Sequence, residues 1–77
     1  MIRIETQPET REEIRRAVDI RCAELGISRS AYAVEYLQAA PHVLKFLLDG
    51  KTRPQTHPEI IKKVNKFTGA TMAAWEN

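Results

Sequence analysis

The chain has 77 residues, a formal net charge of +2 and one cysteine, Cys22. A chain of this length holds one domain with one core and has no room for a second domain with a separate activity. A single cysteine excludes an internal disulfide framework and a thiolate zinc cluster. No apolar run approaches the ~20 residues of a membrane span, and the start Met1-Ile-Arg-Ile-Glu-Thr lacks a signal-peptide core. We therefore expect a cytoplasmic protein without membrane contact.

The positive charge is concentrated in the second half of the chain. Residues 1–37 contain six Arg against seven acidic residues, whereas residues 38–67 contain six Lys or Arg against Asp49 and Glu59. The second half therefore carries a net charge of +4. A basic half fits a nucleic-acid partner, but lysines also fill the solvated face of any helix, so the charge distribution needs a motif to decide between the two.

A first helix is predicted between Thr10 and Gly26. Thr10 and Glu13 have the spacing of a capping box, and glycine commonly follows a helix end. The apolar residues at helical spacing between these ends are Ile14, Ala17, Val18, Cys22 and Leu25. Cys22 is thus expected in the core, because a reactive thiol would need an exposed, electropositive setting.

A second helix is predicted to start at Ser28 or Ser30, both of which suit an N-cap, and to end near residue 38 or 39. The side chains expected to point inward from this helix are Ala33, Val34 and Leu37.

A third helix, about two turns long, begins at Pro41 and ends before Gly50, because proline is tolerated in the first turn of a helix and glycine follows its end. A polar loop with Pro54 follows, and a fourth helix runs from Pro58 to Gly69. The side chains expected to be buried from the fourth helix are Ile60, Ile61, Val64 and Phe67.

The predicted fold is therefore all-α, a compact bundle of four to five short helices that contains a helix-turn-helix. We divide the chain into an extended N-terminal arm over residues 1–8, a helix-turn-helix domain over 9–69 and a C-terminal segment over 70–77. The arm includes Ile2 and Ile4, which alternate as in a strand but have no partner strand. The C-terminal segment is expected to form a turn or a short helix.

The third helix has two faces. Leu44, Leu47 and Leu48 follow helical spacing and face the core, with Val43 at their flank. The opposite face carries His42, Lys45, Phe46 and Asp49. A cation, an imidazole and an aromatic ring on one rigid helix suit the major groove, where they can contact guanine acceptors and thymine methyl groups. A large apolar side chain such as Phe46 on an exposed face usually has a partner.

The third helix is preceded by Ser30-Ala-Tyr-Ala-Val-Glu-Tyr-Leu-Gln-Ala-Ala, and its end is marked by Asp49-Gly-Lys-Thr-Arg-Pro. With these flanks, the run from Ser30 to Pro54 resembles the helix-turn-helix of the Cro and lambda-repressor-like family. The positions that such a motif needs apolar are Ala33, Leu37, Ala39, Leu44 and Leu47. The resemblance extends from about residue 9 to 69 and implies a role in transcription regulation.

This chain differs from that family at three positions. It has Gln38 where glycine is common in the turn, Val34 where alanine is common and Ala40 where a capping Ser or Thr is usual. A glutamine at a turn position that favours positive φ would be strained.

The resemblance implies base contacts from His42, Lys45 and Phe46. It implies sugar-phosphate contacts from Ser30, Lys51, Thr52 and Arg53. Hydroxyls at helix N-termini and flexible cationic loops suit phosphate oxygens, which agrees with this division. The alternatives are that Lys51 and Arg53 only solubilise a loop and that His42 is an ordinary surface residue.

One short recognition helix contacts too few bases to specify a unique site, so we expect a homodimer on double-stranded DNA. Met72 and Trp75 are the predicted dimer contacts, because the rest of the chain offers little core to bury them. The alternative is that Trp75 packs on the first helix near Val18.

The main competing function is a small protein-interaction module that uses the same bundle, such as an antitoxin, an anti-repressor or a phage packaging factor. An enzyme is not expected. His42 and His57 lie on different segments without acidic residues or cysteines at metal-ligand spacing, and the sequence has no nucleophile motif or Gly-rich phosphate loop. No metal, cofactor or small-molecule ligand is therefore expected.

Overall fold

The computed structural model describes residues 7–76, which form an all-α bundle with five α-helices and one 3-10 turn. The elements are α1 (Arg11–Leu25), α2 (Arg29–Glu35), α3 (Pro41–Asp49), η1 (Pro54–Thr56), α4 (Pro58–Thr68) and α5 (Met72–Trp75). The predicted all-α bundle is confirmed. The N-terminal arm with Ile2 and Ile4 lies largely outside the described residues.

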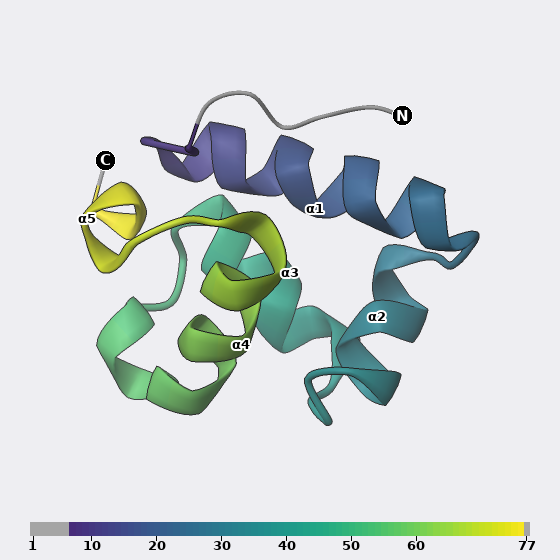
Figure 1. Cartoon of the computed structure of the whole chain (residues 1–77). Coiled ribbons are helices and arrows are strands. Elements are labelled where there is room, and N and C mark those ends of the chain that lie inside the picture. The colour runs from purple at the N-terminus through teal and green to yellow at the C-terminus, as the bar shows by residue number, and fades with distance from the viewer. Residues whose placement is uncertain (1–6, 77) are drawn as a thin grey trace.

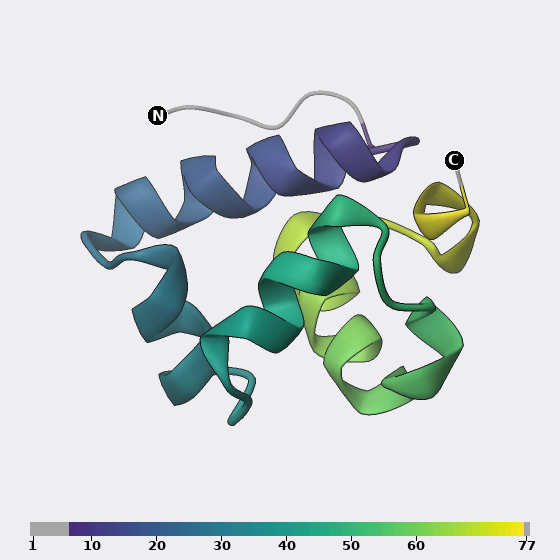
Figure 2. The ribbon, with the colours of Figure 1, turned by 180° about the vertical axis from the view of Figure 1, so that it is seen from behind.

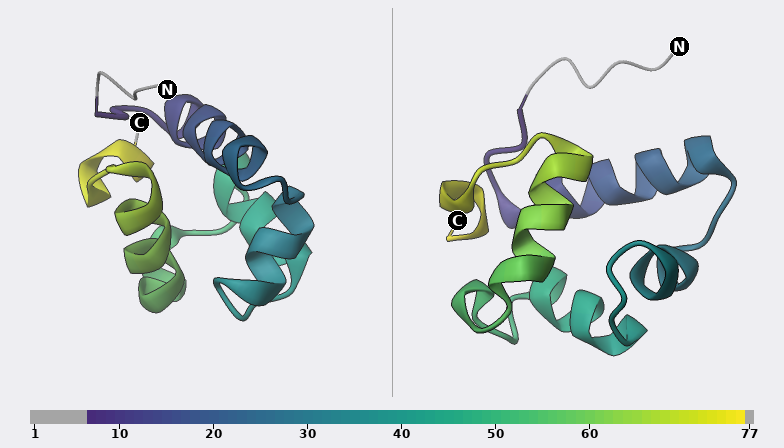
Figure 3. Two further views of the ribbon diagram at one scale, coloured as in Figure 1. Left: turned by 45° about the vertical axis from the view of Figure 1, so that its right-hand side comes forward. Right: turned by 60° about the horizontal axis from the view of Figure 1, so that its bottom comes forward.

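Helix α1 is the longest element, and α2, α3, α4 and α5 all contact it. The left panel of Figure 3 shows α1 across the top, with α4 on one side below it and α2 with α3 on the other. Helix α3 is nearer the viewer in Figure 2, and α4 is nearer the viewer in Figure 1. The two sides of the bundle therefore present different helices.

Local capping fixes both ends of α1 as predicted. The Thr10 side chain accepts a hydrogen bond from the Glu13 backbone N–H at 3.2 Å, and the Glu13 carboxylate accepts one from the Glu9 backbone N–H at 3.4 Å. At the other end Gly26 adopts the left-handed conformation with φ 70°, and the Ile27 N–H donates to the Cys22 carbonyl at 3.0 Å. This bond satisfies a carbonyl of the last turn.

The core gathers side chains from all five α-helices and from the turns between them. Its buried residues are Ile14, Val18, Cys22, Tyr32, Ala33, Leu37, Leu44, Leu47, Leu48, Ile61, Val64, Ala70, Ala74 and Trp75. The predicted core roles of Cys22 and of the three leucines of α3 are confirmed. Ile60 and Phe67 are only partly buried, although both pack against this cluster.

Two residues predicted to face inward do not do so. Leu25 lies in the last turn of α1 and is exposed, because the chain turns away at Gly26 and the next residue, Ile27, packs on the core instead. Val34 is 54 % exposed, since α2 turns Tyr32 and Ala33 toward the core and rotates the following position to the solvent. Helix α2 also ends earlier than predicted, at Glu35.

The turn between α2 and α3 contains a non-glycine residue in the left-handed region, Gln38 with φ 54°. The chain therefore keeps the left-handed conformation that favours glycine at this position of the turn, although a glutamine occupies it. The Ala39 N–H donates to the Ala33 carbonyl at 3.0 Å and closes the turn against α2. The N-cap of α3 is Ala40, which offers no side-chain hydrogen bond, so α3 begins without the usual hydroxyl cap.

The C-terminal segment forms helix α5 and packs on the bundle. Trp75 is fully buried, and its indole Nε1 donates a hydrogen bond to the Asn65 Oδ1 atom of α4 at 2.7 Å. Its backbone carbonyl accepts a hydrogen bond from the Arg11 guanidinium at the start of α1. Of the two predicted dimer contacts, only Met72 is exposed, and Trp75 takes the alternative role in the core of its own chain.

Candidate nucleic-acid interface

Helix α3 is anchored on one face and free on the other. Leu44, Leu47 and Leu48 are buried in the core, and Gly50 ends the helix in the left-handed conformation with φ 79°. This φ favours glycine at position 50, whereas a Cβ atom there would lie 2.5 Å from an Arg11 guanidinium nitrogen and would only displace the movable end of that side chain. The anchored face holds the exposed side chains of α3 in fixed positions.

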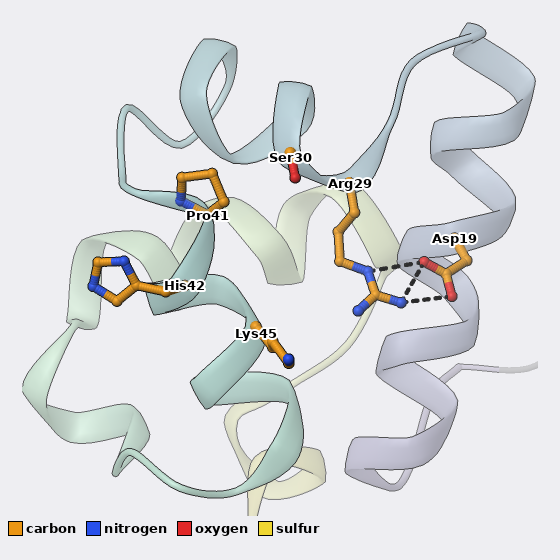
Figure 4. Close-up of a pocket in the computed structure, with 6 residues that line it drawn as sticks. All are labelled: Asp19, Arg29, Ser30, Pro41, His42 and Lys45. Atoms are coloured by element: carbon orange, nitrogen blue, oxygen red, sulfur yellow. Dashed lines mark hydrogen bonds and ion pairs between the residues drawn. The ribbon is translucent and has the colours of Figure 1, made fainter.

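A hollow of about 510 Å³ lies where the start of α2 meets the start of α3. The residues that line it are Asp19, Arg29, Ser30, Pro41, His42 and Lys45, and Figure 4 shows them as sticks. Three of the residues predicted to contact DNA are therefore brought together: Ser30 from α2 and His42 with Lys45 from α3.

Phe46 extends this group along α3. The residue is 38 % exposed, and its ring lies edge-on to the His42 ring with 5.8 Å between ring centroids. The Lys51 Nζ atom stands 6.0 Å from the centre of the Phe46 ring, on its face. His42, Phe46 and Lys51 therefore form a continuous exposed strip next to the hollow.

Two predicted backbone contacts lie further along the chain. Thr52 is half-buried and Arg53 is exposed, and both lead from Lys51 into η1. Neither of them lines the hollow. The Arg53 carbonyl accepts hydrogen bonds from the Thr56 N–H and hydroxyl, which fixes the backbone of this loop.

Asp49 does not share the free face of α3 with the other three side chains. Its Oδ1 atom lies 3.9 Å from Arg15 Nη1, so the carboxylate is turned toward α1. The Arg15 guanidinium partly offsets the charge of this carboxylate, which lies outside the strip formed by His42, Phe46 and Lys51.

Arg29 is a member of the site that the sequence did not reveal. Its guanidinium forms a fork with the Asp19 carboxylate: Nε lies 3.1 Å from Oδ1, and Nη2 lies 2.8 Å from Oδ1 and 2.9 Å from Oδ2. Figure 4 shows this pair beside Ser30 and Lys45. Among the described residues, Arg29 Nη1 has no hydrogen bond, so one edge of the guanidinium remains available. Its place at the start of α2, directly after Ser28, is the signal in the sequence that could have drawn attention to it.

Cys22 takes no part in this site. It is buried in α1, and burial together with the Asp19 carboxylate raises the pKa of its thiol, while the Arg29 guanidinium lowers it to a smaller extent. A thiol of this kind is a weak nucleophile near neutral pH.

Across residues 7–76, no three His, Cys, Asp or Glu side chains come together in a way that could hold a metal ion. Within the same residues, none of the helices combines the length and the apolar character that a membrane crossing needs.

Comparisons with protein-family models, with curated proteins and with solved structures found no match to this chain.

Proposed function

We propose that this chain is a sequence-specific DNA-binding protein that regulates transcription and inserts α3 into the major groove. The observation that carries the proposal is the convergence of Arg29, Ser30, His42 and Lys45 on one hollow beside the exposed ring of Phe46. The resemblance of residues 30–54 to a repressor helix-turn-helix supports the same function.

The dimensions of α3 suit this role. An α-helix with its side chains is ~10 to 12 Å across, which fits the ~12 Å width of the major groove, and the nine residues of α3 give about two and a half turns, enough to present several side chains to base edges. His42 and Lys45 present a hydrogen-bonding imidazole and an ammonium group, which can reach guanine O6 and N7, and Phe46 can contact a thymine methyl group. These three residues are therefore the proposed base contacts.

The phosphate contacts are proposed to come from the two segments on either side of α3. Ser30 and the free edge of Arg29 lie at the start of α2, and Lys51, Thr52 and Arg53 lie in the loop after α3. Guanidinium groups match phosphate oxygens because they donate parallel hydrogen bonds, whereas an ammonium group acts as a point charge. Contacts of this kind hold the protein on the duplex and carry little sequence information.

The protein is proposed to bind as a homodimer on a pseudo-palindromic site, with half-sites about one helical turn, ~34 Å, apart or a multiple of it. Met72 remains the proposed dimer contact, because its side chain is exposed on α5. Sedimentation of the full chain, free and with DNA, tests this. A chain that stays monomeric at high concentration in both states would refute the dimer.

The test of DNA binding uses a duplex selected from a random library and an unselected duplex, each titrated by fluorescence anisotropy at two salt concentrations. Lys45→Gln should lower affinity for the selected duplex by ~1 to 3 kcal/mol and flatten the preference at one or two base pairs. Lys66→Gln removes the same charge from a side chain of α4 that does not line the hollow, and it should leave the preference intact.

An affinity that does not decrease steeply with salt concentration would exclude phosphate recognition. Each phosphate contact releases bound counterions, so it makes the affinity depend on salt. That result would favour the protein-interaction module, with Phe46 as its apolar contact. Equal losses for Lys45→Gln on both duplexes would refute a base-reading role for this lysine.

A further inference from the structure

A second hollow, of about 360 Å³, lies between α1, α2 and α4. The residues that line it are Arg21, Tyr32, Tyr36, Lys63, Lys66 and Phe67, and no residue of α3 is among them. Helix α4, which forms one wall, is nearer the viewer in Figure 1, whereas α3 is nearer the viewer in Figure 2. This hollow is therefore separate from the proposed DNA-binding surface.

Three aromatic rings build the floor and one wall. Tyr32 and Phe67 are stacked with 4.2 Å between ring centroids and 20° between their planes, and Tyr32 is almost completely buried. Tyr36 lies 5.5 Å from Tyr32 and 6.2 Å from Phe67, and it is 49 % exposed. The packed pair fixes the floor, and the Tyr36 ring remains accessible to another flat group.

The rim of this hollow is positively charged. The Arg21 guanidinium lies 5.4 Å from the centre of the Phe67 ring and 3.7 Å from the Glu24 carboxylate. Lys63 and Lys66 are exposed, and neither forms an ion pair within the part of the chain that the structure describes. None of the described residues that line the hollow carries a carboxylate, so an anion would meet two ammonium groups without an ion-pair partner there.

The size and the distribution of apolar surface favour a small ligand over a docked peptide helix. The volume falls in the range of pockets that hold small molecules, roughly 300 to 1,000 Å³. A docked amphipathic helix needs several apolar anchor sites along a groove, whereas Tyr36 is the one large exposed apolar residue that lines this hollow among those described.

We propose that this hollow binds a small aromatic anion, whose ring packs against Tyr36 and Phe67 and whose carboxylate accepts hydrogen bonds from Lys63 and Lys66. This ligand class was not expected from the sequence. Because the hollow shares no lining residue with the one at the start of α3, the ligand and DNA would be able to bind at the same time.

The test is a titration of the full chain, free of DNA, with 2-naphthoate, followed by two-dimensional ¹H–¹⁵N NMR. Saturable shifts are expected at the amides of Tyr36, Lys63, Lys66 and Phe67. Two probes separate the contributions: 2-naphthylmethanol keeps the rings without the charge, and cyclohexanecarboxylate keeps the charge without the planar ring. Each should bind about tenfold more weakly, a loss of ~1.4 kcal/mol, which is the order of a charge-assisted hydrogen bond or of an aromatic ring contact.

Variants locate the site and separate this proposal from the DNA-binding one. The double variant Lys63→Gln, Lys66→Gln should weaken naphthoate binding about tenfold or more, since two charged donors are lost. Lys45→Gln, which alters only the first hollow, should leave it unchanged. The NMR spectrum of each free variant shows whether it is folded. Failure of DNA binding does not affect these outcomes, because no DNA is present.

Absence of saturable shifts with naphthoate would overturn the proposal, as would equal affinity for naphthylmethanol or shifts that map to α3. Two further probes identify other occupants. Tighter binding of an acidic tyrosine-containing peptide would assign the hollow to a protein partner, and tighter binding of a short single-stranded oligothymidylate would assign it to nucleic acid. Either result would also overturn the small-ligand assignment.

Discussion

The indole Nε1 of Trp75 donates a 2.7 Å hydrogen bond to Asn65 Oδ1, and this bond attaches α5 to α4. The Trp75 backbone carbonyl accepts a second hydrogen bond from Arg11 at the start of α1. A buried indole N–H needs an acceptor, and Asn65 supplies it. The last short helix therefore belongs to the core of the bundle.

Trp75→Ala is expected to lower the free energy of unfolding by about 3 to 5 kcal/mol, because it removes a large, fully buried side chain and leaves a cavity. Met72→Ala is the control on the same helix and should change it by less than about 0.5 kcal/mol, since Met72 is 42 % exposed. Chemical denaturation at low protein concentration measures both. Similar losses for the two variants would contradict the core role of Trp75.

Tyr32→Phe is expected to leave the stability unchanged or to raise it by about 1 kcal/mol. The Tyr32 hydroxyl is buried and has no hydrogen-bond partner within residues 7–76, and an unsatisfied buried polar group costs about 1 to 3 kcal/mol. The phenylalanine ring keeps the stacking on Phe67. A loss above 1 kcal/mol in denaturation, on the order of a net hydrogen bond, would show that the hydroxyl does have a partner in solution.

Stability is expected to decrease at alkaline pH. Burial raises the pKa of the Tyr32 hydroxyl well above its ordinary value of 10.0 and raises the pKa of the Cys22 thiol above 9.0. Both groups then stay protonated in the folded chain at a pH where they ionise in the unfolded chain, so the unfolded state is favoured as pH rises above about 9 to 10. Tyr32→Phe should reduce this slope above pH 10. Denaturation midpoints that are flat from pH 8 to 11 in the wild-type chain would contradict both shifts.

Gln38→Gly is expected to stabilise the chain by up to about 1 kcal/mol. The left-handed conformation costs a non-glycine residue about 1 to 2 kcal/mol. Glycine removes this cost, but it also makes the unfolded chain more flexible, which lowers the free energy of unfolding by the smaller amount of about 0.5 to 1 kcal/mol. Gln38→Val should be destabilising, because a β-branched residue tolerates positive φ poorly. The order Gly, Gln, Val in thermal melting checks this, and any other order would contradict the strain.

Asp19→Asn is expected to strengthen binding to random-sequence DNA, because the substitution frees the Arg29 guanidinium to contact a phosphate. The plot of log affinity against log salt concentration should then become steeper by about one unit, as for one added phosphate contact. Glu24→Gln makes the same change in net charge beside Arg21 and serves as the control. The stability of both variants should change by less than about 1 kcal/mol, as for other exposed ion pairs. Equal effects of the two variants on DNA binding would show that only net charge matters.

The features that the sequence predicted well are those set by a few neighbouring residues. Thr10 with Glu13 and Gly26 define the ends of α1, and Pro41 with Gly50 define those of α3. The inward leucines of α3 follow from helical spacing alone. At Gln38 the resemblance indicated a position that favours positive φ, but the glutamine there left the shape of the turn open until the structure showed φ 54°.

The features that the sequence did not predict depend on how helices pack. Val34 and Leu25 have apolar side chains at plausible positions, but packing turns Tyr32 and Ile27 to the core in their place. The η1 turn has no periodic pattern because it is only three residues long. The fork between Arg29 and Asp19 joins residues ten positions apart on two helices, so it becomes visible only when α1 and α2 are placed together.

The hydrogen bond from Arg11 to the Trp75 carbonyl joins residues 64 positions apart, and Trp75 is the largest fully buried side chain. The core is therefore complete only when α5 has closed on both α1 and α4, through the contacts of Trp75 with Arg11 and Asn65. Because a contact between residues so far apart in the sequence carries a large loop-closure entropy, we expect this closure to come late in folding.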